Sequence, residues 1–181
     1  MEDALERLNG LPTAVARAEL LACCGASRWA QEMAARRPFA NSTELFAAAD
    51  EVWRSLDRDD WLEAFASHPQ IGEKRAERQI ESATGQRLSS DWSSEEQSGF
   101  KQDSEDVTEK LAAGNRVYRH RFGYIYIVCA TGKTAPEMLA ILEQRLQNHP
   151  SAELIVAAEE QRRITRLRLE KLLIKGTGEK T

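Results

Sequence analysis

The first half of the chain alternates short stretches of helical apolar spacing with single residues that end helices. Apolar residues recur every three or four positions over four stretches, which cover residues 12–24, 27–37, 41–56 and 59–67. Gly25 and Pro38 follow the first two stretches, where a glycine can close a helix and a proline ends one. We expect Ser27 to cap the second helix, and Asn41 to cap the third with Glu44 three residues later. The pattern therefore predicts four short helices.

The second half of the chain changes its pattern twice. Residues 73–92 lose the apolar spacing and contain several turn-forming residues, so they predict a loop. Helical character resumes at Ser93, where Glu96 stands three residues later as in a capping box, and it continues to about Arg121. The next run, FGYIYIVCA at residues 122–130, is aromatic, β-branched and uncharged. Because a lone strand has no sheet to join, this run predicts an extended buried segment among helices or one piece of a small hairpin.

Two further helices are predicted after this run. Thr134 can cap the first of them, with Glu137 at the third helical position. Ser151 can cap the second, which is expected to continue to about Lys175. Residues 176–181 are expected to form a flexible tail.

Length and composition fit one folded domain. The chain has 181 residues, of which 41% are hydrophobic and 30% are charged. With the helical pattern, these values predict an all-α fold, a single-domain multi-helix bundle over residues 1–175 with one extended segment near residues 122–130. The formal net charge of −4 gives no overall cationic field for a polyphosphate backbone, so nucleic acid is not an expected partner.

Cysteine usage favours a reducing compartment. Cys23, Cys24 and Cys129 form no CxxC pair, so we expect buried thiols and neither a disulfide framework nor a metal site. The N-terminal residues lack the apolar core of a signal peptide, and no run approaches the ~18 apolar residues that cross a bilayer. We therefore expect a cytoplasmic protein with no membrane partner.

His68 is the first residue that could carry chemistry. It follows an apolar helical stretch and precedes Pro69, which disfavours helical geometry at the residue before it. An imidazole at such a helix exit can be presented to a ligand, and its ordinary pKa of about 6.5 allows proton exchange near neutral pH. The alternative is a plain helix cap. The neighbouring residues alone leave both interpretations open.

Two polar features could bind an anion. Glu96 and Gln97 adjoin a predicted helix start, where they either cap the helix or line an anion site formed by its free N–H groups. Arg168 stands four residues after Ile164 and four before Leu172, on the apolar stripe of the last helix. Its guanidinium either extends to solvent along its own stem or meets an anion such as a carboxylate.

Taken in order along the chain, four motifs match a known family. They are HP at residues 68–69, SSEEQSGF at 93–100, FGYIYIVCATGK at 122–133, and ERQ-like and RLRL text at 159–169. This ordered set resembles the 2-oxo-4-hydroxy-4-carboxy-5-ureidoimidazoline (OHCU) decarboxylases of urate breakdown, and the likeness covers nearly the whole chain. The HP pair alone is weak, but its combination with the second and third motifs is specific.

The resemblance implies an all-α, cofactor-free enzyme, usually a homodimer, that decarboxylates a small ureidoimidazoline substrate to (S)-allantoin. It implies that His68 is the catalytic proton carrier, that Glu96 and Gln97 make the important polar contacts with the substrate, and that Arg168 corresponds to the family's late-helix arginine. The full set of substrate-binding residues implied by the resemblance is Pro69, Ser93, Ser94, Glu95, Glu96, Gln97, Tyr126, Ile127, Val128, Cys129, Ala130 and Arg168.

The sequence departs from the family pattern at two places and leaves other functions open. The text at residues 70–74 differs from the family's usual continuation after HP, and Ile125 replaces a proline that many members have. Neither departure removes a residue with an implied role. One alternative is a helical interaction module that docks through the basic last helix, with His68 only a cap. Another is a decarboxylase of a related ureido compound.

Overall fold

The structure is built from helices joined by short connections. The computed structural model describes residues 2–69 and 105–175. Its helices, in chain order, are α1 (Glu2–Gly10), α2 (Thr13–Cys24), α3 (Ser27–Ala35), α4 (Ser42–Ser55), α5 (Arg58–Ala66), α7 (Glu105–Phe122), α8 (Ala135–Arg145) and α9 (Pro150–Lys175). Neither described range contains a strand, which confirms the predicted all-α class. The predicted tail at residues 176–181 lies outside the described residues.

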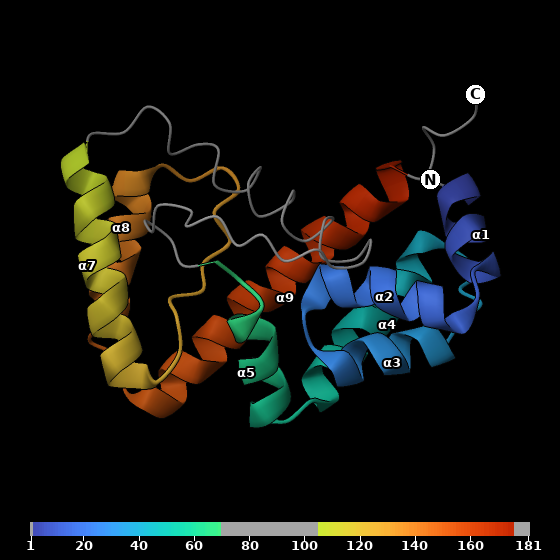
Figure 1. The fold of residues 1–181 in the computed structure, drawn as a ribbon, viewed down its shortest axis with the longest axis horizontal. Coiled ribbons are helices and arrows are strands. Elements are labelled where there is room, and N and C mark those ends of the chain that lie inside the picture. Colours follow the sequence, from blue (N-terminus) through green and yellow to red (C-terminus); the bar gives the residue numbers. More distant parts are fainter. Residues whose placement is uncertain (1, 70–104, 176–181) are drawn as a thin grey trace.

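The long helix α9 is the element that most other helices contact. Figure 1 shows it crossing the molecule, with α1 to α4 near its C-terminal half and α7 and α8 beside its N-terminal part. It packs against α1, α2, α4, α5 and α7. Its buried stripe includes four polar side chains, which are Glu153, Gln161, Thr165 and Arg168. Because buried polar groups are normally paired, these four positions indicate where α9 forms specific hydrogen bonds or ion pairs within the core.

Several helix ends follow the predicted punctuation. The Asn41 side-chain oxygen accepts a hydrogen bond from the backbone N–H of Glu44 at 2.9 Å. Gly25 closes α2 with a φ of 87°, a conformation that favours glycine. A Cβ at Gly25 would lie 2.2 Å from Ser67 Oγ, so only bare backbone fits between the end of α2 and the end of α5. This contact fixes the chain one residue before His68.

Two predicted caps are wrong. Ser27 is the first residue of α3 and not its cap, and its backbone N–H and hydroxyl donate to the Glu63 carboxylate of α5 at 3.0 and 2.6 Å. A carboxylate distant in sequence thus replaces the local cap. Helix α9 begins at Pro150 instead of after Ser151, and the backbone N–H of Ser151 donates to His149 Nδ1 at 3.4 Å.

Helix α1 is an element that the apolar pattern did not predict. Its buried residues, Ala4, Leu5 and Leu8, have helical spacing but cover little more than one turn. It packs against α9, and Arg7 forms an ion pair with Glu19 of α2 at 2.7 Å. Tertiary contacts therefore account for this helix better than its own sequence does.

The segment between α7 and α8 is extended, as predicted, and a buried ion pair holds it in place. Residues 126–130 are buried and have neither helical nor strand structure. Arg145 of α8 donates to the Ile127 carbonyl and to the Glu153 carboxylate of α9, each at 2.7 Å. Tyr118 of α7 donates to the same carboxylate. The network ties three helices and the extended segment together.

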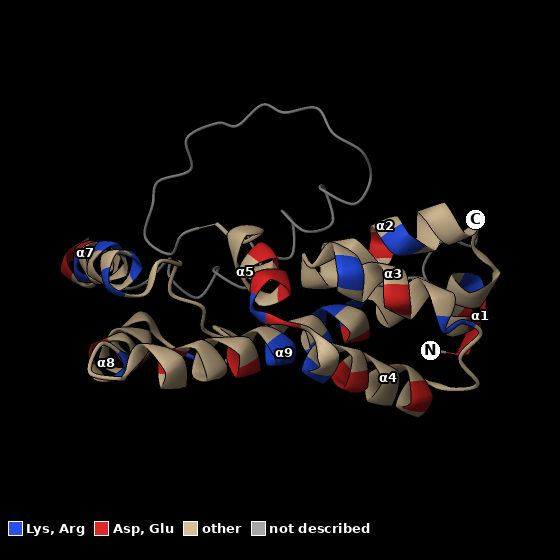
Figure 2. Ribbon diagram, turned by 90° about the horizontal axis from the view of Figure 1, so that it is seen from below, with Lys and Arg blue, Asp and Glu red and all other residues tan. Residues whose placement is uncertain are grey.

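Charges of both signs are spread over the helices. Figure 2 shows acidic and basic residues interspersed on α3 and α9. Among the described helices, none is long and apolar enough to cross a membrane. The described ranges hold no group of three or more His, Cys, Asp and Glu side chains that could bind a metal ion. All three cysteines are buried and outside any disulfide, as the sequence predicted.

Candidate active site

His68 stands where α5 ends. The helix stops at Ala66, Ser67 follows as its C-cap, and the backbone N–H of His68 donates to the Phe65 carbonyl at 3.2 Å. The imidazole is half-buried, whereas Pro69 is exposed. The prediction that the helix ends just before this proline is therefore confirmed, and it leaves the His68 side chain free to turn toward α9.

Gln161 of α9 contacts one of the two ring nitrogens of His68. His68 Nε2 lies 2.7 Å from Gln161 Oε1. The amide nitrogen of the same Gln161 donates to the Cys24 carbonyl at 3.0 Å and to Thr165 Oγ1 at 3.3 Å. Gln161 is fully buried. Gln161 thus forms hydrogen bonds both with the imidazole and with the C-terminal end of α2.

Arg168 approaches the other ring nitrogen. Its Nη2 lies 3.5 Å from His68 Nδ1, at the long limit of a hydrogen bond. The side chain is only 1% exposed, which excludes the interpretation that it extends to solvent along its stem. Gln161 and Arg168 are seven residues apart, two helical turns, and so share one face of α9. The imidazole lies between them.

This environment keeps His68 uncharged. The pKa of His68 falls from the ordinary 6.5 to about 3, first because of burial and then because of the positive charge of Arg168, while the hydrogen bond to Gln161 partly opposes both. At neutral pH the imidazole is therefore in the form that can accept a proton. An anion bound beside Arg168 would offset the positive charge and raise the pKa, so ligand binding would favour protonation.

We expect the half-buried imidazole to make folding stability depend on pH. The unfolded chain protonates His68 below about pH 6.5, whereas the folded chain resists protonation until the pH approaches 3. The unfolded state therefore binds more protons in this window, and stability falls as the pH falls, by at most about 1.4 kcal/mol per pH unit from this group. Urea unfolding at pH 7.5, 6.0 and 5.0 measures the slope.

The control for this prediction is His68→Asn, which removes the titrating group. The carboxylates of the protein contribute equally to both slopes, so the wild type should lose more stability than the variant between pH 6.5 and 5. Equal slopes would show that His68 titrates normally in the folded protein.

The extended segment is anchored to the same part of α9. Cys129 N–H donates to the Glu160 carboxylate at 2.7 Å, and Glu160 directly precedes Gln161. The Tyr124 and Phe65 rings also pack together, with centroids 5.3 Å apart, so the segment lies against the end of α5. Successive residues of α9 thus hold the extended segment and the imidazole.

Several backbone groups of this segment are already hydrogen bonded within the protein. Tyr126 N–H donates to the Asn115 side chain at 3.0 Å, and the Cys129 carbonyl accepts from Lys133 Nζ at 2.6 Å. The Ile127 carbonyl and Cys129 N–H are engaged by Arg145 and Glu160, as described above. The expectation that residues 126–130 contact a ligand stays a prediction. These bonds reduce the number of backbone N–H and C=O groups in the segment that are available to a ligand.

The structure brings together only part of the predicted site. It places His68 and Arg168 side by side, and it places the extended segment close by. The predicted residues Ser93, Ser94, Glu95, Glu96 and Gln97 all lie outside the described residues, so their position relative to His68 stays a prediction. Pro69 is the last described residue before them, and its contact with a substrate also stays a prediction.

Two residues that contact this site were missed in the sequence. Gln161 binds His68, and Glu160 binds the extended segment. Gln161 carries the same signal that singled out Arg168, because it is a polar residue on the apolar stripe, two turns earlier on the helix. Glu160 lies beside that stripe among other charged residues, and no local pattern separates it from them.

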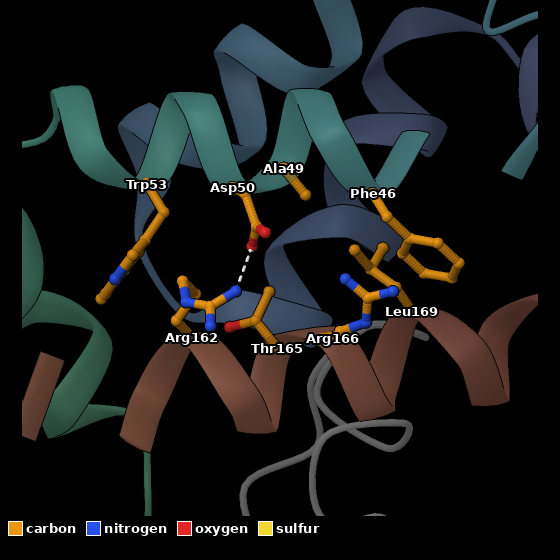
Figure 3. A pocket seen from close by; sticks show the side chains of 8 residues that line it. All are labelled: Phe46, Ala49, Asp50, Trp53, Arg162, Thr165, Arg166 and Leu169. Carbon is orange, nitrogen blue, oxygen red and sulfur yellow. Dashed lines mark hydrogen bonds and ion pairs between the residues drawn. The ribbon is translucent and has the colours of Figure 1, made fainter. Parts of the chain in front are cut away.

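A hollow lies between α4 and α9, away from His68 (Figure 3). Arg162 points across it to Asp50, with 2.7 Å between their charged atoms, and also pairs with Glu159 at 2.7 Å. The Arg166 guanidinium lies 4.7 Å from the centre of the Phe46 ring. Both cations are thus engaged within the protein, so this hollow is a poor candidate for an anionic substrate.

Comparison with known proteins gives a consistent result. A model of the OHCU decarboxylase family matches residues 9–170. The chain is 37% identical over 154 residues to the "Uric acid degradation bifunctional protein TTL" of Arabidopsis thaliana, and 28% identical over 137 residues to the 2-oxo-4-hydroxy-4-carboxy-5-ureidoimidazoline decarboxylase of Amia calva. These alignments cover 83% and 76% of this chain and 45% and 75% of the two relatives. The chain thus spans less than half the length of the Arabidopsis protein.

Solved structures agree with the sequence relatives. A crystal structure of OHCU decarboxylase in the presence of (S)-allantoin superposes with a TM-score of 0.72 and 36% identity, over 87% of this chain and 98% of that one. A crystal structure of (S)-allantoin synthase superposes with a TM-score of 0.66 and 20% identity, over 93% of this chain and 53% of the other. At that identity, the second match supports the fold alone.

Proposed function

The chain belongs to the OHCU decarboxylase family, and from this premise we propose that it is a cofactor-independent carboxy-lyase that converts OHCU to (S)-allantoin in urate breakdown. The observation that carries the proposal is the uncharged imidazole of His68, held between Gln161 and the buried Arg168. A neutral base beside a buried cation suits a reaction that starts from a carboxylate and moves a proton.

The reaction itself defines what the site must do. The substrate carries a carboxylate and a hydroxyl on one ring carbon, next to a carbon that bears the ureido group and a C=N bond. When the bond to the carboxylate breaks, CO2 leaves, its electron pair forms a C=C bond between the two ring carbons, and the electrons of the C=N bond move to the nitrogen, which takes a proton from solvent. The resulting enol becomes a ring amide carbonyl when the hydroxyl proton is lost and the ureido-bearing carbon gains one. The second step sets the handedness of the product.

In this scheme His68 carries the proton. Its neutral imidazole accepts the hydroxyl proton and delivers a proton to one face of the carbon, a transfer worth about 10²–10⁴-fold in rate. Arg168 orients the carboxylate, because a guanidinium matches a carboxylate in charge and geometry. CO2 carries no charge, so the attraction to Arg168 weakens as the bond breaks.

The remaining contacts are carried over from the family resemblance. We propose that Glu96 and Gln97 bind the amide and ureido groups, and that Ser93, Ser94 and Glu95 also contact the substrate. Pro69 is proposed to border the substrate next to His68. Residues 126–130 are proposed to supply further contacts from the extended segment. A homodimer and a cytoplasmic location are likewise proposals that rest on the resemblance.

Arg168→Gln tests the carboxylate contact. We expect KM to rise by about 10- to 100-fold, because a hydrogen-bonded charge pair is worth about 1.5–3 kcal/mol. The matched control is Arg163→Gln, an exposed arginine on the same helix, which should leave KM unchanged. Steady-state kinetics on freshly generated substrate measure both. An unchanged KM in Arg168→Gln would assign Arg168 a structural role only.

The proposed activity is tested by following optical activity during substrate decay. OHCU freshly generated from urate decays spontaneously to racemic allantoin, so wild-type protein should produce an excess of the S enantiomer and faster loss of substrate. An equal mixture formed at the spontaneous rate would favour the helical interaction module. Turnover of a related ureido compound in place of OHCU would favour the diverged decarboxylase.

A further inference from the structure

The Cys24 carbonyl is a fixed acceptor at the end of α2. Cys24 is the last residue of that helix, and a carbonyl in this position lacks a backbone N–H partner within the helix. Gln161 Nε2 donates to it at 3.0 Å, in a buried environment. A carbonyl oxygen can only accept a hydrogen bond, so the group that faces it must be a donor.

This acceptor determines which way the Gln161 amide points. If the amide were reversed, Gln161 Oε1 would face the Cys24 carbonyl and two acceptors would meet in a buried place without a proton between them. The NH2 group therefore faces Cys24, where Thr165 Oγ1 also accepts from it at 3.3 Å. Gln161 Oε1 is left facing His68 Nε2 at 2.7 Å.

The amide orientation in turn determines where the imidazole carries its proton. Gln161 Oε1 can only accept, so His68 Nε2 must carry the proton of the neutral ring. The guanidinium of Arg168 can only donate, and it faces His68 Nδ1, which must therefore be the unprotonated ring nitrogen. The two neighbours of the ring, one at each nitrogen, require the same tautomer.

We propose that Gln161 is a positioning residue. The Cys24 carbonyl fixes the orientation of its amide, and the amide oxygen in turn keeps the proton of His68 on Nε2, so that Nδ1 exchanges protons with the substrate. This inference rests on the proposed function for the role of Nδ1, whereas the tautomer itself can be measured without any substrate. Gln161 does not touch the reacting atoms in this scheme.

A neutral amide is suited to this task in a way that a carboxylate is not. A carboxylate at Nε2–H would stabilise the charged imidazolium, as the aspartate of a Ser-His-Asp triad does. The Gln161 oxygen orients the ring with much less stabilisation of positive charge, and Arg168 opposes that charge. The proton taken up at Nδ1 is therefore held weakly and is readily delivered to carbon.

The tautomer is tested directly by nitrogen NMR of ¹⁵N-histidine-labelled protein without substrate. The chain has three histidines, and His120 and His149 are exposed, so the His68 signals can be assigned by their loss in His68→Asn. We expect Nε2 to carry the proton and Nδ1 to be bare from pH 8 to pH 6. A proton on Nδ1, or a mixture of both tautomers, in the wild-type protein would overturn the inference. This measurement requires no folded Gln161 variant.

Gln161→Met removes all three hydrogen bonds of the amide, to His68, Cys24 and Thr165, with little change in shape. We expect kcat to fall by about 10- to 100-fold with a smaller change in KM, as for other residues that orient a functional side chain, and the His68 signals to show both tautomers. Thr165→Val removes one partner of Gln161 but keeps Cys24 and His68 in contact with it, so it should retain a single tautomer. Gln31→Met changes an exposed glutamine of α3 and should leave both readouts unchanged.

The outcomes separate this inference from the proposed function. If wild-type protein gives an excess of (S)-allantoin and Gln161→Met retains full kcat and a single tautomer, the positioning role fails and the function stands. If wild-type protein gives only racemic product, the proposed function fails, whereas the NMR result still decides whether Gln161 sets the tautomer of His68.

Discussion

Replacement of His68 by asparagine is expected to lower kcat by about 10²–10⁴-fold, the largest effect on activity from a single substitution in this chain. The imidazole faces α9 from the end of α5, where it can accept a proton from the substrate and return it, and burial and the charge of Arg168 keep it uncharged before substrate binds. Asparagine retains a polar side chain of smaller size but cannot be protonated in this range. The rate of substrate loss and the enantiomeric excess of the product measure the effect.

The matched control for this prediction is His120→Asn, an exposed histidine in α7. It should retain wild-type turnover, and both variants should keep the helical circular dichroism of the wild type. A His68→Asn protein with intact helices and near-normal turnover would remove His68 from the mechanism. A loss of activity accompanied by unfolding would be resolved by His68→Gln, a longer side chain that can still reach Gln161.

Replacement of Arg145 by methionine is expected to lower the free energy of unfolding by about 3–5 kcal/mol, the largest effect on stability. In the wild type, Arg145 Nη2 lies 2.6 Å from Glu153 Oε1, and the Glu153 side chain is fully buried. The substitution leaves this buried carboxylate without its cationic partner. It also removes the hydrogen bond to the Ile127 carbonyl, so the extended segment loses one of its attachments to α8. Urea unfolding at pH 7 measures the loss.

A double variant separates the ion pair from simple loss of packing. Arg145→Met with Glu153→Gln removes both charges and keeps an acceptor for Tyr118, so it should be more stable than Arg145→Met alone. Arg116→Met, at an exposed position of α7, should change stability by less than about 0.5 kcal/mol. A loss below about 1 kcal/mol in Arg145→Met would show that the pair with Glu153 contributes little to the stability of the fold.

Local chemistry made much of the fold predictable. Helix α2 ends at Gly25 because glycine readily adopts the left-handed backbone conformation that closes a helix. Helix α5 ends before His68 because Pro69 disfavours helical geometry at the residue before it. Arg168 was singled out because a cation stood on an apolar stripe. In each case one residue type in one place constrains the backbone or the charge, so no distant partner is needed for the prediction.

The remaining features depend on partners that are distant in sequence. Glu63 replaces the expected cap at Ser27, and Cys24 lies 137 positions from the glutamine that binds it. Such pairings become visible only when the helices are placed in space. The site itself is therefore predictable as a set of residues, whereas the proton positions that make it work follow from the fold.

The close approach at Gly25 also bears on how much variation the chain can accept. Two independent restrictions act there, a φ of 87° and a space in which any Cβ would lie 2.2 Å from Ser67 Oγ. In a library of variants selected for turnover, position 25 should thus tolerate as few amino acids as position 68. The restriction at one position is steric and at the other chemical, so intolerance to mutation alone would wrongly place a glycine among the residues that act on the substrate.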